Sequence, residues 1–190
     1  PMDGAGQLGR DIDFFVVDAT QPEQHIVVEE VFQNLGLYMI PYGRNRIDIQ
    51  VPAAQRLQPE STGIKMMLDI LHRSRIEFPG MAMGFLHRIM DEGIRHCKER
   101  FVGGQSLFGY DQVQERLGRL QAYFTTCSAM CAFTSETVSL ADNMAKHSIP
   151  ANSIKTVATD MMQEASQSLL QLFGGKGYRL DSFAGRATVD

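Results

Sequence analysis

In Gln171-Leu172-Phe173-Gly174-Gly175-Lys176-Gly177-Tyr178, a glycine-rich turn follows directly on a long amphipathic pattern, and this order decides the fold. The pattern begins at Ser148, has Pro150 in its first turn and repeats apolar residues at helical spacing as far as Leu170. Glycine is the usual residue at which a helix ends in a left-handed turn, so Gly174 marks a C-terminal stop. We therefore predict a long helix from Ser148 to Phe173, with the glycine turn after it.

Two further helical patterns precede this one. The first runs from residue 61 to Gly103-Gly104, and Pro79-Gly80 inside it is expected to kink the helix. The second begins at Asp111, predicted as its N-cap, and continues towards Ser139. Three long helices joined by short loops pack roughly antiparallel, and we expect a fourth helix after Asp190.

The first 60 residues have a different character. Short apolar runs alternate with Pro, Gly, Asn and Asp, which is typical of strands and turns. The predicted strands are Phe14-Phe15-Val16-Val17, Ile26-Val27-Val28 and Ile47-Asp48-Ile49-Gln50-Val51. So few strands do not make a stable sheet by themselves, so residues 1–60 are interpreted as the end of a β domain whose first part is missing.

The predicted fold class is therefore mainly α: a partial β domain over residues 1–60, followed by a truncated antiparallel up-down helical bundle over residues 61–190. Pro1 at the start and Asp190 at the end suggest that both ends are cuts within a longer protein.

Composition bounds the function. The net charge of −4 and 44% hydrophobic content describe an ordinary globular protein, and the acidic balance makes nucleic acid an unexpected partner. No apolar run of eighteen residues and no basic-then-apolar leader occurs, so neither a membrane span nor a signal peptide is predicted. The three cysteines, Cys97, Cys127 and Cys131, lie in helical patterns, which favours a reduced compartment: bacterial cytoplasm or an organelle matrix.

A series of weak motifs becomes specific when taken in order. Along the first helical pattern stand Gly63-Ile64-Lys65, Arg73-Ser74-Arg75, Gly84, Arg88, Asp91-Glu92, Lys98-Glu99-Arg100, Gly104 and Leu107, and the glycine turn Gly174-Gly175-Lys176-Gly177 closes the third. This order resembles the C-terminal helical domain of acyl-CoA dehydrogenases. The passage Gly43-Arg44, Val51-Pro52 and Leu57 is similar to the family's entry from its middle β domain.

The resemblance implies a function. A flavoenzyme of this family removes hydrogens from Cα and Cβ of an acyl-CoA thioester, with FAD as cofactor, an electron-transferring flavoprotein as the usual oxidant and a homodimer or homotetramer as the assembly. The catalytic glutamate lies in the family a few residues beyond the aspartate that matches Asp190. Hence we expect no catalytic residue within the 190 residues and no activity from them alone.

The resemblance also implies cofactor contacts. Arg100 matches an arginine that reaches the FAD diphosphate of the neighbouring subunit, and Gln171, Gly174 and Gly175 match the other half of this shared site. A guanidinium suits phosphate oxygens because its donors are planar and always charged. From the residues alone, Arg100 is more readily a solvated arginine at a helix end, and Gly174 a plain helix cap; the resemblance reverses this preference for Arg100. Gly103 departs from the usual aromatic, and Asp111 from the usual glutamine.

Ser74 and Arg75 match the family's Thr-Arg pair near the CoA part of the substrate. Pairing of Arg75 with Asp69 or Glu77 is the alternative. His72 stands where the family commonly has aspartate, which leaves the acyl-CoA substrate open.

Other candidate groups have ordinary explanations. Cys127 and Cys131 lie one turn apart but lack a second ligand pair, so core positions are predicted rather than a metal site. His87 and His96 are expected to be solvated or capping residues.

Three other functions remain open: a flavin-dependent oxidase or hydroxylase on the same fold, a helical oligomerisation scaffold without flavin, and a DNA-associated relative, which the acidic balance disfavours. Acyl-chain length is not predicted.

Overall fold

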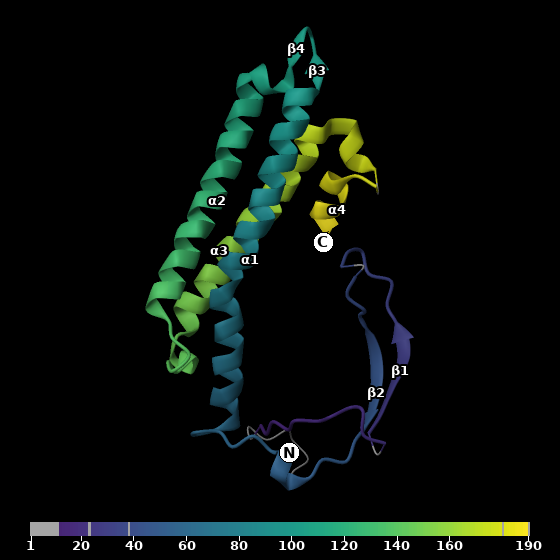
Figure 1. Cartoon of the computed structure of the whole chain (residues 1–190), viewed down its shortest axis with the longest axis vertical. Helices are drawn as coiled ribbons and strands as arrows, with labels where there is room; N and C mark the ends of the chain where they lie inside the picture. The colour runs from purple at the N-terminus through teal and green to yellow at the C-terminus, as the bar shows by residue number, and fades with distance from the viewer. Residues whose placement is uncertain (1–11, 23, 38, 180, 190) are drawn as a thin grey trace, which may run out of the picture. The chain divides into compact units, whose positions relative to one another are not determined.

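The computed structural model of the chain describes residues 12–22, 24–37, 39–179 and 181–189. These residues form two compact units, which divide between Ile70 and Leu71. The first unit holds two strands and the second a bundle of helices (Figure 1). The chain is mostly helical, which confirms the predicted fold class. The predicted domain boundary at residue 60 stays a prediction.

The first unit is built on an antiparallel strand pair, β1 (His25–Val31) and β2 (Gly43–Asp48). The strand predicted at residues 26–28 is confirmed, but the one predicted at residues 47–51 begins and ends earlier. The backbone pairing of β2 with β1 reaches only as far as Asp48. Beyond it, the side-chain amide of Gln24 bonds to the backbone instead: it donates to the Gln50 carbonyl at 2.7 Å and accepts from the Gln50 N–H at 3.2 Å. The strand predicted at residues 14–17 is wrong, since Phe15 forms only an isolated bridge to Arg56.

Helix α1 (Gly63–Glu99) begins in the first unit and continues through the second. The helix continues through Pro79, which is buried inside it. Its buried side chains recur every three or four residues and form one seam against the core: Ile76, Pro79, Ala82, Leu86, Ile89, Gly93 and Cys97. Helix α1 ends at Glu99 rather than at the glycines. Gly103 and Gly104, both with positive φ, instead form the turn between β3 (Phe101–Val102) and β4 (Gln105–Ser106).

Helix α2 (Asp111–Thr137) packs against α3 (Ser148–Phe173). The N-cap of α2 is Tyr110, not Asp111 as predicted, and Asp111 is the first helical residue, where its charge suits the helix dipole. The predicted bounds of α3 are confirmed. Gly174 ends it with φ 55°, and its N–H donates to the carbonyls of Gln171 and Leu170.

A short turn, η4 (Gly174–Tyr178), and a last helix, α4 (Phe183–Val189), complete the described chain. The fourth helix thus begins before Asp190, not after it as predicted; Asp190 itself lies outside the described residues. A second turn, η2 (Leu107–Gly109), precedes α2, and η1 (Ala53–Gln55) and η3 (Met144–Lys146) lie in the loops before α1 and α3. The main core lies among α1, α2, α3 and α4, with Leu86, Ile89 and Leu169 fully buried.

Candidate functional site

The predicted FAD contacts come together at one end of the helical unit. Helices α1 and α3 finish side by side, because the ring of His96, near the end of α1, stacks on Phe173, the last residue of α3 (Figure 1). Arg100 follows His96 by one helical turn, and Gly174 follows Phe173 directly. The structure therefore places Arg100 and the glycine turn at the same end, although seventy residues separate them in sequence.

The backbone around Arg100 is held on both sides. Its N–H donates to the His96 carbonyl at 2.9 Å, and its own carbonyl accepts from the Leu107 N–H at 2.7 Å. The residue is exposed, and among the described residues no carboxylate lies within 4.0 Å of its guanidinium. Arg100 thus presents an uncompensated positive charge from a fixed backbone, which suits an anionic ligand.

The glycines of the turn have two separate roles. The N–H of Gly174 is used to cap α3, so it does not point at a ligand. A Cβ built on Gly174 or on Gly175 would meet no atom within 4 Å, and both residues are exposed. The open face of this turn leaves room for a ligand to approach the backbone closely.

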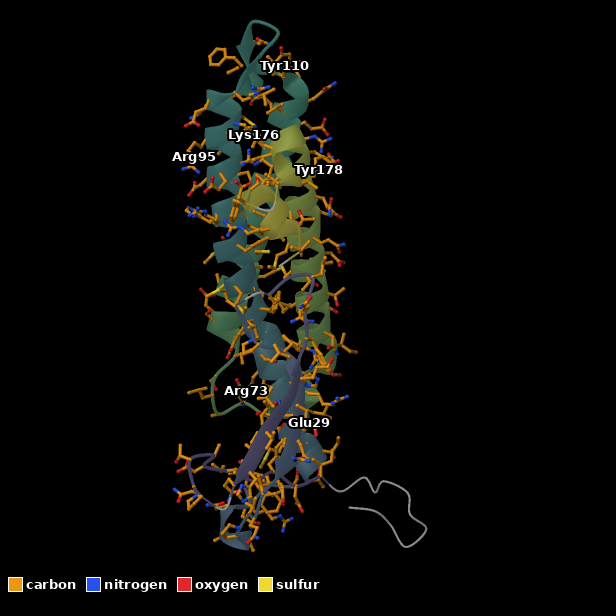
Figure 2. The ribbon with its side chains drawn as sticks, turned by 90° about the vertical axis from the view of Figure 1, so that its right-hand side faces the viewer. Glu29, Arg73, Arg95, Tyr110, Lys176 and Tyr178 are labelled. Carbon is orange, nitrogen blue, oxygen red and sulfur yellow. The ribbon has the colours of Figure 1, made fainter. Side chains whose placement is uncertain are left out.

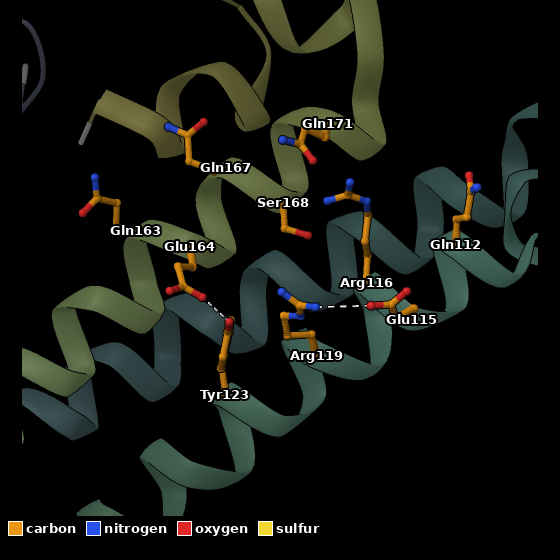
Figure 3. Close-up of a pocket in the computed structure, with 10 residues that line it drawn as sticks. All are labelled: Gln112, Glu115, Arg116, Arg119, Tyr123, Gln163, Glu164, Gln167, Ser168 and Gln171. Carbon is orange, nitrogen blue, oxygen red and sulfur yellow. Dashed lines mark hydrogen bonds and ion pairs between the residues drawn. The ribbon is translucent and has the colours of Figure 1, made fainter.

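Gln171 lies on the wall of a polar surface groove of about 790 Å³ between α2 and α3 (Figure 3). One pair crosses the groove: the Tyr123 hydroxyl on α2 donates to Glu164 on α3. A second pair, Arg119 with Glu115 at 3.2 Å, lies along α2. The bond to Glu164 is also the main reason that the pKa of Tyr123 is raised. The groove is lined by Gln112, Glu115, Arg116, Arg119, Tyr123, Gln163, Glu164, Gln167, Ser168 and Gln171.

His96 is the residue at this end that the sequence did not single out. A solvated or capping role was predicted, whereas the imidazole is half-buried and stacked on Phe173, with the ring centres 4.1 Å apart, close to the backbone of Leu172. Burial, chiefly, and then the positive charges of Lys176 and Arg100 hold the pKa of His96 below its ordinary value. Its partners come from helices far apart in sequence, so helical periodicity alone could not reveal the stack.

Ser74 and Arg75 lie well away from these residues, roughly 38 Å along α1 by its rise of about 1.5 Å per residue. The Ser74 hydroxyl donates to the Leu71 carbonyl at 3.0 Å. Arg75 is half-buried, and within the described chain neither Asp69 nor Glu77 lies within ion-pairing distance of it. The alternative explanation of Arg75, pairing with one of these two carboxylates, is therefore not seen among the described residues.

The residues beside this pair hold the loop between α2 and α3. A ring nitrogen of His72, which is 3% exposed, lies 2.7 Å from the Met144 carbonyl. The neighbouring guanidinium of Arg73 donates to the carbonyls of Ser139 and Asp142. The buried His72 thus makes a contact that ties α1 to the loop before α3.

The structure also bears on metal ligation and on membrane insertion. In the part of the chain that the structure describes, no three His, Cys, Asp or Glu side chains are grouped to hold a metal ion. Cys127 is buried against Met161, with 3.9 Å between the sulfur atoms. No described helix is both long and apolar enough to cross a bilayer.

The donor set fits a flavin dinucleotide. An exposed guanidinium without a carboxylate partner, a primary amide at the edge of a groove and an open glycine turn gather at one end of the bundle. These groups match the charge and hydrogen-bond acceptors of a diphosphate.

Comparison with known proteins agrees with this geometry. Residues 61–190 match the family described as acyl-CoA dehydrogenase, C-terminal domain. Cyclohexane-1-carbonyl-CoA dehydrogenase of Geobacter metallireducens is 25% identical over 171 residues, which cover 90% of this chain and 44% of that protein. The chain therefore spans less than half the length of this relative.

Solved structures share the fold. Butyryl-CoA dehydrogenase from Megasphaera elsdenii superposes with a TM-score of 0.76 at 20% identity, covering 94% of this chain and 45% of that one. The prolyl acyl carrier protein oxidase AnaB gives a TM-score of 0.80 at 16% identity, covering 93% of this chain and 46% of its own. With the family match extending over most of the sequence, this chain belongs to the acyl-CoA dehydrogenase family, of which it carries the C-terminal helical domain.

Proposed function

We propose that this chain is part of an FAD-dependent oxidoreductase that dehydrogenates an acyl-CoA thioester between Cα and Cβ. Its own contribution is to supply contacts to the flavin of a neighbouring subunit and to drive self-association. The observation that carries the proposal is the meeting of Arg100 with the glycine turn at one end of α1 and α3, fixed by the stack of His96 on Phe173.

Each residue has a stated part in this proposal. Arg100 donates to the diphosphate oxygens of FAD, and Gln171 donates or accepts at the adenosine side, while Gly174 and Gly175 leave space for the ligand. Bound FAD would supply the hydride acceptor. Ser74 and Arg75, roughly 38 Å away along α1, would contact the CoA part of the chain's own substrate. This separation supports assigning the two sets of residues to different flavin sites of an oligomer.

Self-association is supported by apolar side chains at the other end of the helical unit. Phe133 is 59% exposed, Leu140 94% and Ile149 79%. Where such groups adjoin one another in a contiguous patch, they mark a contact surface. We expect the complete protein to form a homotetramer arranged as a dimer of dimers, and light scattering tests this; a stable monomer contradicts it.

The flavin contacts are tested on the complete protein by measuring FAD dissociation from the parent and from Arg100→Ala. Loss of one charge-assisted contact costs about 1.5–3 kcal/mol, so the dissociation constant should rise roughly tenfold to a hundredfold. Arg95→Ala is the matched control: Arg95 is exposed on α1, five residues before Arg100, but pairs with Glu92. Unchanged FAD affinity in Arg100→Ala would sink the assignment.

A second function is a flavin-dependent oxidase, favoured by the structural likeness to the oxidase AnaB at a TM-score of 0.80. The two reactions differ in the fate of the electrons. A dehydrogenase reduces a dye or an electron-transferring flavoprotein, whereas an oxidase releases hydrogen peroxide. Assaying both products with an acyl-CoA series separates them.

The 190 residues alone are proposed to be inert, since the base expected by the family resemblance follows the position of Asp190. Incubating them with FAD, acyl-CoA thioesters and a dye tests this. Turnover above the buffer blank would place the base inside this chain.

The cytoplasm or an organelle matrix remains the location that we propose for the protein.

A further inference from the structure

Three groups with nitrogen donors meet where α1 and α3 end. His96 lies in the last turn of α1, Arg100 is the first residue after that helix, and Lys176 belongs to η4, the turn that follows α3. The charges of Lys176 and Arg100 both act on the His96 imidazole, so each cation lies within electrostatic reach of the ring. In Figure 2, Lys176 lies in the same end of the helical unit as Tyr110.

The charge at this end is not balanced by the described residues. Neither Arg100 nor Lys176 has a carboxylate within 4.0 Å among them, and the acid that acts on His96 is Glu99, the neighbour of Arg100 on α1. The other group facing the imidazole is the Leu172 carbonyl of α3. Two exposed cations beside a titratable ring make a site for a ligand with more than one negative charge.

The imidazole is held in place by packing. Its ring stacks on Phe173 with the planes 17° apart and the centroids 4.1 Å apart. Because α1 and α3 both contribute to this stack, the packing of the two helix ends limits the movement of the ring. Lys176 and Arg100 both act electrostatically on this ring, so a proton gained or lost by His96 changes the charge beside both cations.

We propose that His96 and Lys176 join Arg100 in binding the diphosphate of the flavin dinucleotide, and that binding places a proton on His96. This inference rests on the proposed function and adds two ligand residues and a pH dependence to it. No covalent step is involved: one proton moves from solvent to a ring nitrogen.

The sign of the pH dependence follows from the charges. Without ligand, burial and two neighbouring cations favour the neutral imidazole. A bound diphosphate compensates both cations and attracts an imidazolium, so the pKa of His96 rises on binding. The bound state then holds more protons than the free state, and affinity increases as the pH falls. Between pH 8 and pH 6 the dissociation constant should fall by roughly threefold to tenfold.

The experiment is calorimetric titration of FAD into the complete flavin-free protein, in two buffers with different ionisation enthalpies, at pH 6, 7 and 8. The difference in heat gives the number of protons taken up. The parent should take up a fraction of a proton, largest near pH 6 to 7. His96→Phe keeps a ring to stack on Phe173 and should take up none. NMR titration of the parent's His96 ring, with and without FAD, measures the same rise in pKa without any substitution.

Lys176 is tested separately because its exposed position in η4 makes misfolding of a variant no concern. Lys176→Gln should weaken FAD binding by roughly threefold to tenfold, and Lys176→Arg should restore it. The control is Arg95→Gln. Arg95 lies on α1, like His96, but is paired with Glu92, so this variant should leave both the FAD affinity and the proton uptake as in the parent.

The outcomes separate the two proposals. If FAD does not bind, or binds without regard to Arg100, the proposed function fails and this inference fails with it. If FAD binding depends on Arg100 but proton uptake persists in His96→Phe, or the parent's His96 pKa does not rise, only the inference is overturned. Equal affinity of Lys176→Gln and the parent removes Lys176 from the site.

Discussion

The guanidinium of Arg88, on α1, lies over the ring of Phe183, the first residue of α4, at 5.2 Å from the ring centre. The same guanidinium pairs with Glu92 at 2.6 Å, and Arg95 pairs with Glu92 from the other side. Glu92 is only 7% exposed, so its carboxylate needs these partners. Arg88 therefore connects a buried charge on α1 to the last helix of the described chain.

This relationship predicts that Arg88 and Arg95 are not equivalent. Arg88→Ala removes an ion pair and the contact with Phe183, whereas Arg95→Ala removes only an ion pair. When either arginine is removed, the other still pairs with the buried Glu92, so the two variants lose a similar ion pair. The ring contact, which only Arg88→Ala loses, adds about 0.5–1 kcal/mol. We expect faster amide hydrogen exchange in α4 for Arg88→Ala and parent-like exchange for Arg95→Ala. Equal exchange in the two variants would show that the ring contact does not hold α4.

The approach of α4 to the glycine turn gives a second prediction. A Cβ on Gly185 would lie 2.6 Å from the Gly177 carbonyl oxygen and 2.8 Å from that of Arg179. Backbone oxygens cannot yield as side chains do, so Gly185→Ala should destabilise the helical unit by roughly 1–3 kcal/mol. Gly84, exposed within α1 with nothing within 4 Å of a Cβ, is the control. Gly84→Ala should stabilise by about 0.5–1 kcal/mol, and denaturant unfolding measures both.

A parent-like midpoint for Gly185→Ala would mean that α4 sits farther from η4 than the structure has it. In that case the hydrogen-exchange difference expected for Arg88→Ala should also be small, because both contacts fix the same helix.

The sequence predicted the bounds of elements that end at residues with strong backbone preferences. It did not predict bounds that depend on contacts between distant segments. The bounds of α3 follow from Pro150 and Gly174, two residues with strong backbone preferences, and the structure has them where they were predicted. The end of β2 depends instead on the side chain of Gln24, which lies 26 residues from Gln50. No periodicity in either segment indicates that contact.

The residues of the candidate site also fall into those that the sequence indicated and those that it did not. Arg100 and the glycine turn were found because each stands in a motif of known order. His96 was missed because its stacking partner and the nearby Lys176 belong to segments beyond α2. Its role depends on two helix ends meeting, which only the packed bundle shows.

Thiol reactivity gives a third prediction. Burial raises the pKa of Cys97 and of Cys127, and both side chains are fully buried. Cys131 is partly exposed beside a pocket of about 270 Å³ between α1 and α2. Because the thiolate is the reactive form, Cys131 should be alkylated first at pH 8. Mass spectrometry of peptides after brief alkylation checks the order, and modification of Cys97 or Cys127 before Cys131 would contradict it.

The last prediction concerns stability between pH 7 and pH 5. In the folded chain the pKa of His96 lies below its ordinary value of 6.5, chiefly through burial. The unfolded chain therefore binds a proton more readily in this range, and folding stability falls as the pH drops below about 6.5. His96→Phe removes the titrating group and keeps a ring against Phe173, so its stability should depend less on pH than that of the parent.

Other groups act outside this window. Hydrogen bonds from Thr20 and Gln21 hold the pKa of Asp18 at about 2, and bonds from Ser139 and Arg179 lower those of Asp142 and Asp181. Their stabilising effect is lost only as the pH falls below the ordinary carboxyl range, so it does not overlap with that of His96. His87→Gln is the control, since His87 is exposed beside Asp91 at 3.5 Å. Denaturant unfolding of the parent and both variants at pH 5, 6 and 7 measures how the stability of each depends on pH. The same slope in His96→Phe as in the parent would mean that the buried ring titrates as it does in the unfolded chain.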